Sequence, residues 1–260
     1  MTDSQTTVAR ESAARGVGLH SGADVELRLR PAPAGTGVVF VRDDLPGSPE
    51  VRCHPAAVDR SGLQRRTELV GDDGARVITP EHFLAACMGL GLDNVRVHLT
   101  GAEIPIFDGS AQEFVALIER AGIVPLEAER RPLRLRQPVI LTQDDREIIA
   151  MPARSMQLAF FAMLTHAGMH NQAAACEIGG EIGTRRFREL ACARTFVFYE
   201  EIERLRAAGL IRGGSLDCAI VLRDGQPIGL NGSNQPGQYR LPNELACHKL
   251  LDLLGDLAVL

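Results

Sequence analysis

The sequence contains no tryptophan, 2 tyrosines and 9 phenylalanines among its 260 residues. Sites that bind single-stranded nucleic acids or sugars by stacking depend on exposed aromatic side chains, so the composition argues against a stacking-rich groove. Basic residues are not in excess either, since 28 lysines and arginines stand against 33 aspartates and glutamates, which gives a formal net charge of −5. We therefore predict no broad nucleic-acid-binding surface and no nucleic-acid partner.

Long apolar runs are also missing. No run approaches the roughly 18 residues that a membrane-spanning helix needs, and residues 1–10 are polar, without the apolar region of a secretion signal. The 6 cysteines lie far apart and form no Cys-x-x-Cys pair, which favours free thiols in a reducing compartment over a disulfide framework or a cysteine zinc site. We predict a cytoplasmic protein with no integral membrane segment.

The first half of the chain alternates between strand-like and helix-like segments. Residues 25–29 and 95–99 alternate apolar with polar side chains, as half-buried strands do, and residues 67–70 and 75–79 flank a Gly-Asp-Asp-Gly turn typical of a hairpin. A helix is predicted from Thr79 as N-cap and Pro80 as first helical residue to residues 89–91. A second helix follows the capping-box spacing of Ser110 and Glu113 and stops at Gly122.

The pattern starts again after residues 124–132, which are charged and bracketed by prolines and which we interpret as a linker. Strands are predicted at 133–141, 147–151, 156–164 and 219–222, and helices at 201–208 and from Pro242 to about Gly255. Two successive blocks of strands and helices predict an α+β protein with two domains, residues 1–126 and 127–260.

Two local pairs could bind a metal ion. Glu81 and His82 are adjacent in the first turn of a predicted helix, where a glutamate could act beside a metal ligand. His248 and Asp252 are four residues apart in the last predicted helix and therefore share one face, a spacing that suits one zinc ion. Each pair alone has an ordinary alternative, because a first-turn glutamate is favoured by the helix dipole and a polar stripe can simply face solvent.

The other histidines carry less information. His20 lies in the glycine-dense segment 16–22, which indicates close approach of the backbone to another group but is equally compatible with an ordinary β-turn. His166 and His170 share a segment without a clear pattern, and His54 and His98 fit surface or packing positions. No serine or cysteine has the local sequence of a catalytic nucleophile.

Taken together, several motifs resemble one family, and they occur in its order along nearly the whole chain. The matching segments are Gly-Val-Gly-Leu-His-Ser-Gly at 16–22, Arg-Pro-Ala-Pro at 30–33, Thr-Pro-Glu-His-Phe-Leu-Ala-Ala at 79–86, Gly-Leu-Gly-Leu-Asp-Asn at 89–94, Glu-Ile-Pro-Ile-Phe-Asp-Gly-Ser-Ala at 103–111, Ala-Arg-Thr-Phe at 193–196, Gly-Gly-Ser-Leu-Asp at 213–217 and His-Lys-Leu-Leu-Asp at 248–252. The sequence is similar to the zinc-dependent UDP-3-O-acyl-N-acetylglucosamine deacetylases of lipid A biosynthesis.

The resemblance implies two domains that each pack two helices against a β-sheet, with the active site between them. It implies a monomer that removes acetate from a UDP-linked, 3-O-acylated amino sugar, with the acyl chain in an apolar passage. The implied roles are zinc ligation by His82, His248 and Asp252, general-base catalysis by Glu81, oxyanion binding by Thr195, orientation of a catalytic histidine by Asp256, and substrate binding by Lys249, Phe196 and His20.

The chain also departs from the family pattern. In the family, the general-acid histidine lies in a glycine-rich segment after the last helix, farther from the second zinc histidine than the 12 residues that follow His248 in this sequence. We therefore expect a C-terminally shortened member, with His20, His166 and His170 as unranked replacements for this acid. Cys218 stands in place of an asparagine, and Leu-Thr-His-Ala at 164–167 in place of Phe-x-His-Pro. Two alternatives remain open: a weakly active homologue that binds zinc or the nucleotide-sugar lipid, and a deacetylase of another acylated amino sugar.

Overall fold

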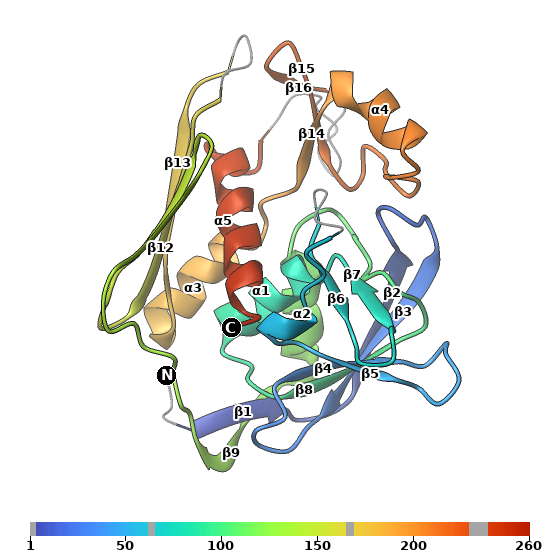
Figure 1. Ribbon diagram of the computed structural model, residues 1–260, viewed down its shortest axis with the longest axis vertical. Helices are drawn as coiled ribbons and strands as arrows, with labels where there is room; N and C mark the ends of the chain where they lie inside the picture. Colours follow the sequence, from blue (N-terminus) through green and yellow to red (C-terminus); the bar gives the residue numbers. More distant parts are fainter. Residues whose placement is uncertain (1–3, 62–65, 165–168, 229–238) are drawn as a thin grey trace.

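The structure is a computed structural model that describes residues 4–61, 66–164, 169–228 and 239–260 (Figure 1). Helices and strands are mixed along the chain, which confirms the predicted α+β class. The α-helices of the described residues are α1 (Glu81–Leu90), α2 (Gln112–Ala121), α3 (Gly180–Leu190), α4 (Ile202–Ala207) and α5 (Glu244–Leu257), with short 3₁₀ turns at Pro55–Ala57 and Tyr199–Glu201. None of these helices is long and apolar enough to cross a membrane.

A five-stranded sheet organises the first half, with the strand order β2-β3-β8-β4-β5. Only the β4–β8 pair of this sheet is parallel. A separate hairpin, β6–β7, leads directly into α1. The strands involved are β2 (Ser12–Val17), β3 (Asp24–Pro31), β4 (Val38–Arg42), β5 (Glu50–Arg52), β6 (Glu68–Val70), β7 (Arg76–Ile78) and β8 (Val95–Leu99).

Apolar side chains from α1, α2 and the sheet form one continuous core. Phe83 of α1 is fully buried, and its ring makes edge-to-face contacts with Phe40 of β4, at a centroid distance of 6.0 Å, and with Phe114 of α2, at 5.7 Å. Such pairs stabilise a core beyond the burial of their area. This packing fixes α1, and with it the Glu81-His82 pair at its start.

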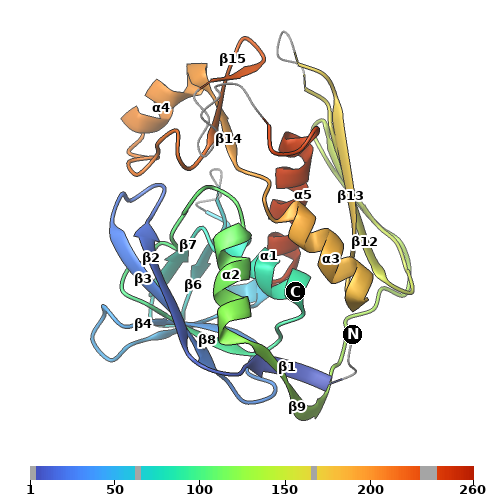
Figure 2. The ribbon, with the colours of Figure 1, turned by 180° about the vertical axis from the view of Figure 1, so that it is seen from behind.

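The second half contains smaller sheets. An antiparallel pair, β12–β13, is covered by α3 and α5, and a parallel β14–β15 pair continues antiparallel into β16 (Figure 2). The hairpin β10–β11 is exposed along almost its whole length. These strands are β10 (Val139–Gln143), β11 (Arg146–Ala150), β12 (Met156–Ala162), β13 (Gln172–Ile178), β14 (Phe196–Phe198), β15 (Ile220–Arg223) and β16 (Gln226–Ile228).

The predicted linker is largely a strand. Residues 123–129 form β9 (Ile123–Glu129), which pairs antiparallel with β1 (Ser4–Val8). Arg130, directly after β9, donates to Asp93 Oδ2 at 2.7 Å and to the carbonyl oxygen of Gly91 at 3.0 Å. Thr6 of β1 binds the same two groups. Arg130, one of the charged residues that indicated a linker, therefore attaches this segment to the end of α1.

Replacing Arg130 with alanine is expected to lower the free energy of unfolding by about 1.5 kcal/mol, because it removes charge-assisted hydrogen bonds that are partly shielded from water. Urea unfolding measures this change. Arg131→Ala is the matched control, since Arg131 is exposed and adjacent in sequence, and it should change the free energy of unfolding by no more than a few tenths of a kcal/mol. Equal losses in the two variants would contradict this role of Arg130.

Two further local predictions are corrected. Thr79 does not cap α1: Pro80 takes the N-cap position without a side-chain hydrogen bond, and the Thr79 hydroxyl donates to Glu103 instead. Of the predicted strand 133–141, only the end from Val139 onward is a strand, in β10. Residues 172–190, for which the sequence predicted no element, form β13 and α3, which sequence periodicity missed.

The packing of α1 against α5 brings the two halves together (Figure 1). In α5 the apolar residues Leu250, Leu251 and Leu254 recur at helical spacing and are buried. At Gly255 a Cβ atom would lie 2.7 Å from the carbonyl carbon of Glu81 and closer still to its oxygen. Only glycine permits this approach, which places the last turns of α5 against the start of α1.

Candidate active site

Three potential metal ligands converge where α1 meets α5. His82 lies in the first turn of α1, while His248 and Asp252 lie one turn apart on α5. One ligand atom from each residue falls within 4.8 Å of the others. Asp252 Oδ1 is 3.2 Å from His82 Nε2 and 3.3 Å from His248 Nε2. The two local pairs identified in the sequence thus form a single cluster.

A backbone carbonyl group fixes the orientation of the His248 ring through its Nδ1. His248 is fully buried, and its Nδ1 donates to the carbonyl oxygen of Ala193 at 3.0 Å. A histidine that donates through one ring nitrogen presents the lone pair of the other, which is the arrangement found around metal-ligating histidines. Nε2 of His248 is therefore the atom available to a metal.

His248 and Asp252 already hold the protonation state that a metal ion needs, whereas His82 does not. Burial lowers the pKa of His248 to about 3, so this ring is neutral at physiological pH. Burial opposes charge on His82 as well, but its close contact with the negatively charged Asp252 carboxylate raises its pKa. Burial also opposes ionisation of Asp252, yet the surrounding imidazoles and the Lys249 ammonium keep its pKa well below the ordinary range.

Two buried atoms of the cluster support a bound zinc ion, and this observation does not depend on the family resemblance. His248 Nε2 and Asp252 Oδ1 are buried polar atoms without a hydrogen-bond partner in the described part of the chain. Buried polar groups of this kind are costly unless a partner satisfies them. Two imidazoles and one carboxylate are also a ligand set that catalytic zinc sites use, with a further position left open.

Metal binding is expected to release protons. Burial raises the pKa of Glu81 to about 8, so without metal this carboxyl is mostly protonated at pH 7. A divalent ion beside it favours the carboxylate, and His82 must also give up any proton on its ligand atom, so roughly one proton or more should leave per ion bound. Titration calorimetry in buffers of different ionisation enthalpy measures this number.

The proton count should fall as the pH rises through about 8, because Glu81 is then ionised before the metal arrives. Glu81→Gln is the control and should reduce the count at pH 7 by up to one proton. A count of zero at pH 7 in the unaltered protein would show that Glu81 and His82 carry no proton before the metal binds, contrary to the pKa shifts of these two groups.

Glu81 and Asp256 are joined by a residue that sequence reasoning missed. Glu81 is 8% exposed, and the backbone N–H of Thr67 donates to its Oε2 at 3.4 Å. The hydroxyl of Thr67 donates to Asp256 Oδ1 at 2.5 Å. Burial raises the pKa of Asp256. No local motif marks Thr67, because its role depends on the fold bringing the start of β6 next to α5.

Lys249 contacts the cluster directly, and Phe196 lies next to Lys249. Lys249 Nζ is 2.8 Å from Asp252 Oδ2 and 5.5 Å from the centre of the Phe196 ring, and the Asp252 carboxylate raises its pKa. Thr195 is two residues beyond Ala193, which holds His248. Its backbone N–H donates to the carbonyl oxygen of Gly109 at 2.8 Å. The roles that the resemblance implies for these residues, substrate binding by Lys249 and Phe196 and oxyanion binding by Thr195, stay predictions.

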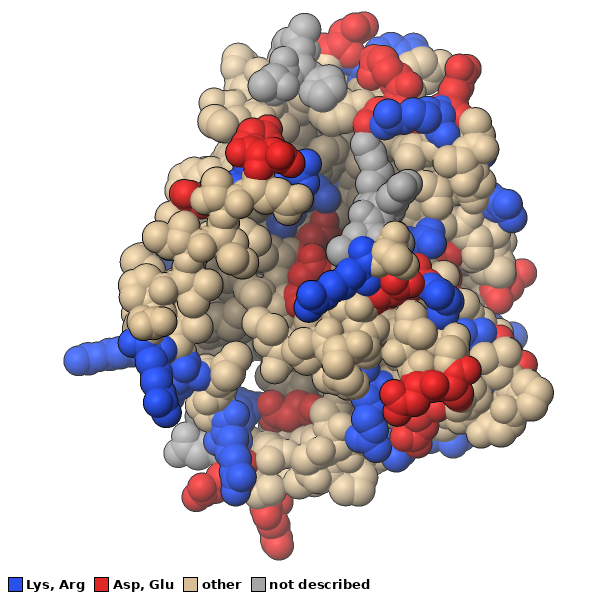
Figure 3. Space-filling model, viewed as in Figure 1, with Lys and Arg blue, Asp and Glu red and all other residues tan. Residues whose placement is uncertain are grey.

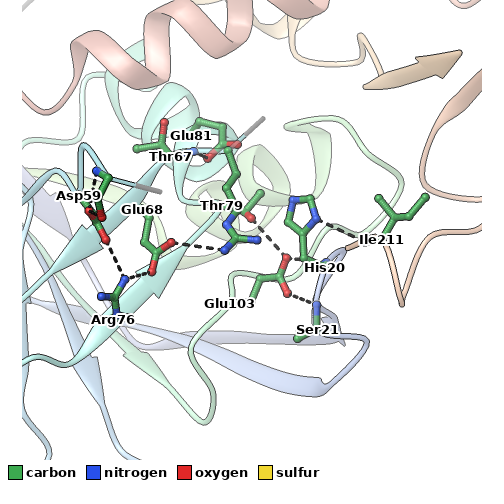
Figure 4. A network of polar contacts seen from close by, with 12 residues as sticks. His20, Ser21, Asp59, Thr67, Glu68, Arg76, Thr79, Glu81, Glu103 and Ile211 are labelled. Carbon is green, nitrogen blue, oxygen red and sulfur yellow. Dashed lines mark hydrogen bonds and ion pairs between the residues drawn. The ribbon is translucent and has the colours of Figure 1, made fainter. Parts of the chain in front are cut away.

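His20 is placed on a loop between β2 and β3 and contacts the second half. Its ring is buried, and Nδ1 lies 3.5 Å from the backbone nitrogen of Ile211 (Figure 4). Burial lowers its pKa. His170 is exposed, and His166 lies outside the described residues. Of the two candidates for the replacement acid that lie in the described residues, His20 is buried and His170 is exposed.

The face that carries these elements is hollowed. Figure 3 shows a hollow near the middle of this face, beside the position of α5, with acidic side chains at its floor and basic ones on its rim. Such a charge distribution suits a metal site that is approached by an anionic substrate.

Comparison with known proteins agrees with this site. Residues 5–260 match the family described as LpxC, UDP-3-O-acyl N-acetylglycosamine deacetylase. A UDP-3-O-acyl-N-acetylglucosamine deacetylase of Myxococcus xanthus (strain DK1622) is 40% identical over 256 residues, which cover 98% of this chain and 77% of that protein. The match includes every element that builds the cluster. The chain therefore belongs to the UDP-3-O-acyl N-acetylglycosamine deacetylase family.

Proposed function

We propose that this protein hydrolyses the N-acetyl group of UDP-3-O-acyl-N-acetylglucosamine and releases acetate, in lipid A biosynthesis. The observation that carries the proposal is the convergence of His82, His248 and Asp252 beside the buried Glu81. Membership in a family of deacetylases supports the reaction, and the name of the Myxococcus relative supports the substrate.

His82, His248 and Asp252 would hold a zinc ion, as the two orphaned ligand atoms favour. When bound, zinc supplies Lewis acidity that makes water a nucleophile near neutral pH and polarises a carbonyl group. The neutral His248 and the ionised Asp252 bring one negative charge to this divalent ion. The remaining positive charge favours the negative charge that develops on the amide oxygen.

Glu81 is the proposed general base. Its carboxylate takes a proton from the attacking water and can deliver it to the amide nitrogen as the C–N bond breaks. Thr67 keeps the carboxylate in place through its backbone N–H. Thr195 is proposed to donate its hydroxyl to the amide oxygen in the tetrahedral state, where such a bond contributes most.

The remaining residues are proposed to bind the substrate. The Lys249 ammonium attracts the anionic nucleotide sugar, Phe196 offers an apolar surface beside it, and His20 lines the opposite side. Asp256 is proposed to orient a catalytic histidine, as the resemblance implies, and its contact with Thr67 would also help to hold the base. We also propose two domains, residues 1–126 and 127–260, a monomeric state and a cytoplasmic location.

The test is acetate release from UDP-3-O-acyl-N-acetylglucosamine by the zinc-loaded protein, with the free amine identified by mass spectrometry. The proposal predicts stoichiometric acetate and amine. Faster release from a different acylated amino sugar in a substrate panel would instead support the alternative substrate. Binding of the nucleotide sugar with background turnover would overturn the catalytic assignment in favour of a binding protein.

A further inference from the structure

Glu103 is a buried carboxylate that the proposed mechanism does not use. It is 3% exposed and lies in the segment that follows β8. Its oxygens accept hydrogen bonds from the backbone nitrogens of His20, at 2.8 Å, and Ser21, at 2.7 Å (Figure 4). Two charge-assisted bonds to adjacent backbone groups hold the loop between β2 and β3 in one conformation.

The same carboxylate reaches the start of α1. Its Oε1 accepts from the Thr79 hydroxyl at 3.3 Å. Thr79 has a φ of 59°, in the left-handed region, which is unfavourable for a β-branched residue and persists only where neighbours enforce it. The Thr79 N–H also donates to the carbonyl oxygen of Thr67 at 2.9 Å. Glu103 therefore connects, through Thr79 and Thr67, to the carboxylate of Glu81.

The loop that Glu103 holds is in contact with the second half of the chain. The backbone nitrogens of Arg212 and Gly213 donate to the carbonyl oxygens of His20, at 3.3 Å, and Leu19, at 3.0 Å. A Cβ atom on Gly18 would lie 2.9 Å from the Glu103 carboxyl carbon, so the loop is seated directly on this side chain. The position of the His20 ring thus depends on the Glu103 carboxylate.

We infer that Glu103 is a positioning residue that sets the place of the His20 imidazole relative to Glu81. This inference rests on the proposed function, in which His20 binds the substrate and Glu81 is the base. Glu103 influences both residues indirectly, since its own contacts are with the backbone groups of the His20 loop and with the Thr79 hydroxyl. Its carboxylate is specifically needed, because an amide would present an N–H group to one of the two backbone N–H donors.

The experiment compares Glu103→Gln, His20→Ala and their combination in the zinc-loaded full chain. Asp93→Asn is the matched control, since the Asp93 carboxylate also accepts a hydrogen bond from a backbone N–H, that of Thr6, outside the His20 loop. Three quantities are measured: bound zinc, kcat and KM for acetate release, and the NMR signals of the labelled His20 ring. The last readout does not depend on activity.

Glu103→Gln should retain zinc, shift the His20 signals and lower kcat/KM by about tenfold or more, the effect of one unsatisfied buried donor. Added to His20→Ala, it should lower kcat/KM by less than about twofold, because the two residues act as one unit. Asp93→Asn should leave the His20 signals in place.

Unchanged His20 signals in Glu103→Gln, or fully additive losses in the double variant, would overturn the inference. If Glu103→Gln does not fold, Glu103→Asp gives the same comparison, since it keeps the charge but is too short to reach both backbone groups. If the unaltered protein releases no acetate, the proposed function fails, while the NMR comparison still decides whether Glu103 positions His20.

Discussion

Replacing Glu81 with glutamine should reduce acetate release by about 10²–10⁴-fold, the range typical of removing a general base. The substitution keeps the size of the side chain and its place beside Thr67, but an amide cannot take a proton from water. Zinc content should stay at one ion per chain, because the cluster is formed by His82, His248 and Asp252. Steady-state kinetics and metal analysis on the same preparation measure both effects.

The matched control for this variant is Glu113→Gln. Glu113 occupies the first turn of α2 as Glu81 does that of α1, but it is exposed, so the control should keep full activity. Equal rates for the unaltered protein and Glu81→Gln would remove Glu81 from the mechanism. Loss of zinc in Glu81→Gln would instead show that the glutamate belongs to the ligand set.

A single methyl group on Gly255 should lower kcat by about 100-fold. In Gly255→Ala the new Cβ would overlap the backbone of Glu81, and backbone cannot move aside as a flexible side chain can. Helix α5 must therefore shift away from α1, which separates Asp252 from His82. A displacement of about 1 Å in a catalytic site can cost 100-fold, and overpacking of this kind costs roughly 1–3 kcal/mol of stability.

Kinetics, zinc affinity and thermal unfolding of Gly255→Ala test this prediction, and zinc should bind more weakly than in the unaltered protein. Gly101→Ala serves as control, because a Cβ there would meet only Val25 at an ordinary 3.4 Å. An active Gly255→Ala with normal zinc affinity would show that the α1–α5 contact is not what sets the cluster.

The sequence alone was sufficient to predict which site residues lie close together when they are near one another in the chain. His248 and Asp252 share a helix, and their spacing alone places them on one face. Glu81 and His82 are adjacent, so their proximity needs no fold. That the two pairs form one site followed only from the family resemblance, since two helices so far apart in the sequence have no local signal of contact. The structure supplies that contact through Gly255.

Residues whose role depends on long-range contacts were not predictable in this way. Thr67 lies in an unremarkable segment, and Glu103 begins a family motif to which the sequence assigned no role. Their partners come from α1, α5 and the glycine-rich loop, which only the fold brings to them. Residues 124–132 were interpreted as a linker because the strand β9, which covers most of them, is mostly exposed and therefore lacks an apolar alternation. Helix α3 was missed because Gly180 and Gly183 lower its helix propensity while Phe187 packs it against Gly89.

The proposed function depends above all on a metal ion that His82, His248 and Asp252 would hold and that would support amide hydrolysis. The direct measurement is acetate release from UDP-3-O-acyl-N-acetylglucosamine by the purified protein before chelation, after chelation and after addition of one equivalent of zinc, with Asp252→Ala alongside. We predict that activity disappears on chelation, returns with zinc, and is absent in Asp252→Ala, which should hold little metal. Acetate release that survives chelation, or an Asp252→Ala variant that binds zinc and turns over normally, would contradict a catalytic metal at this cluster.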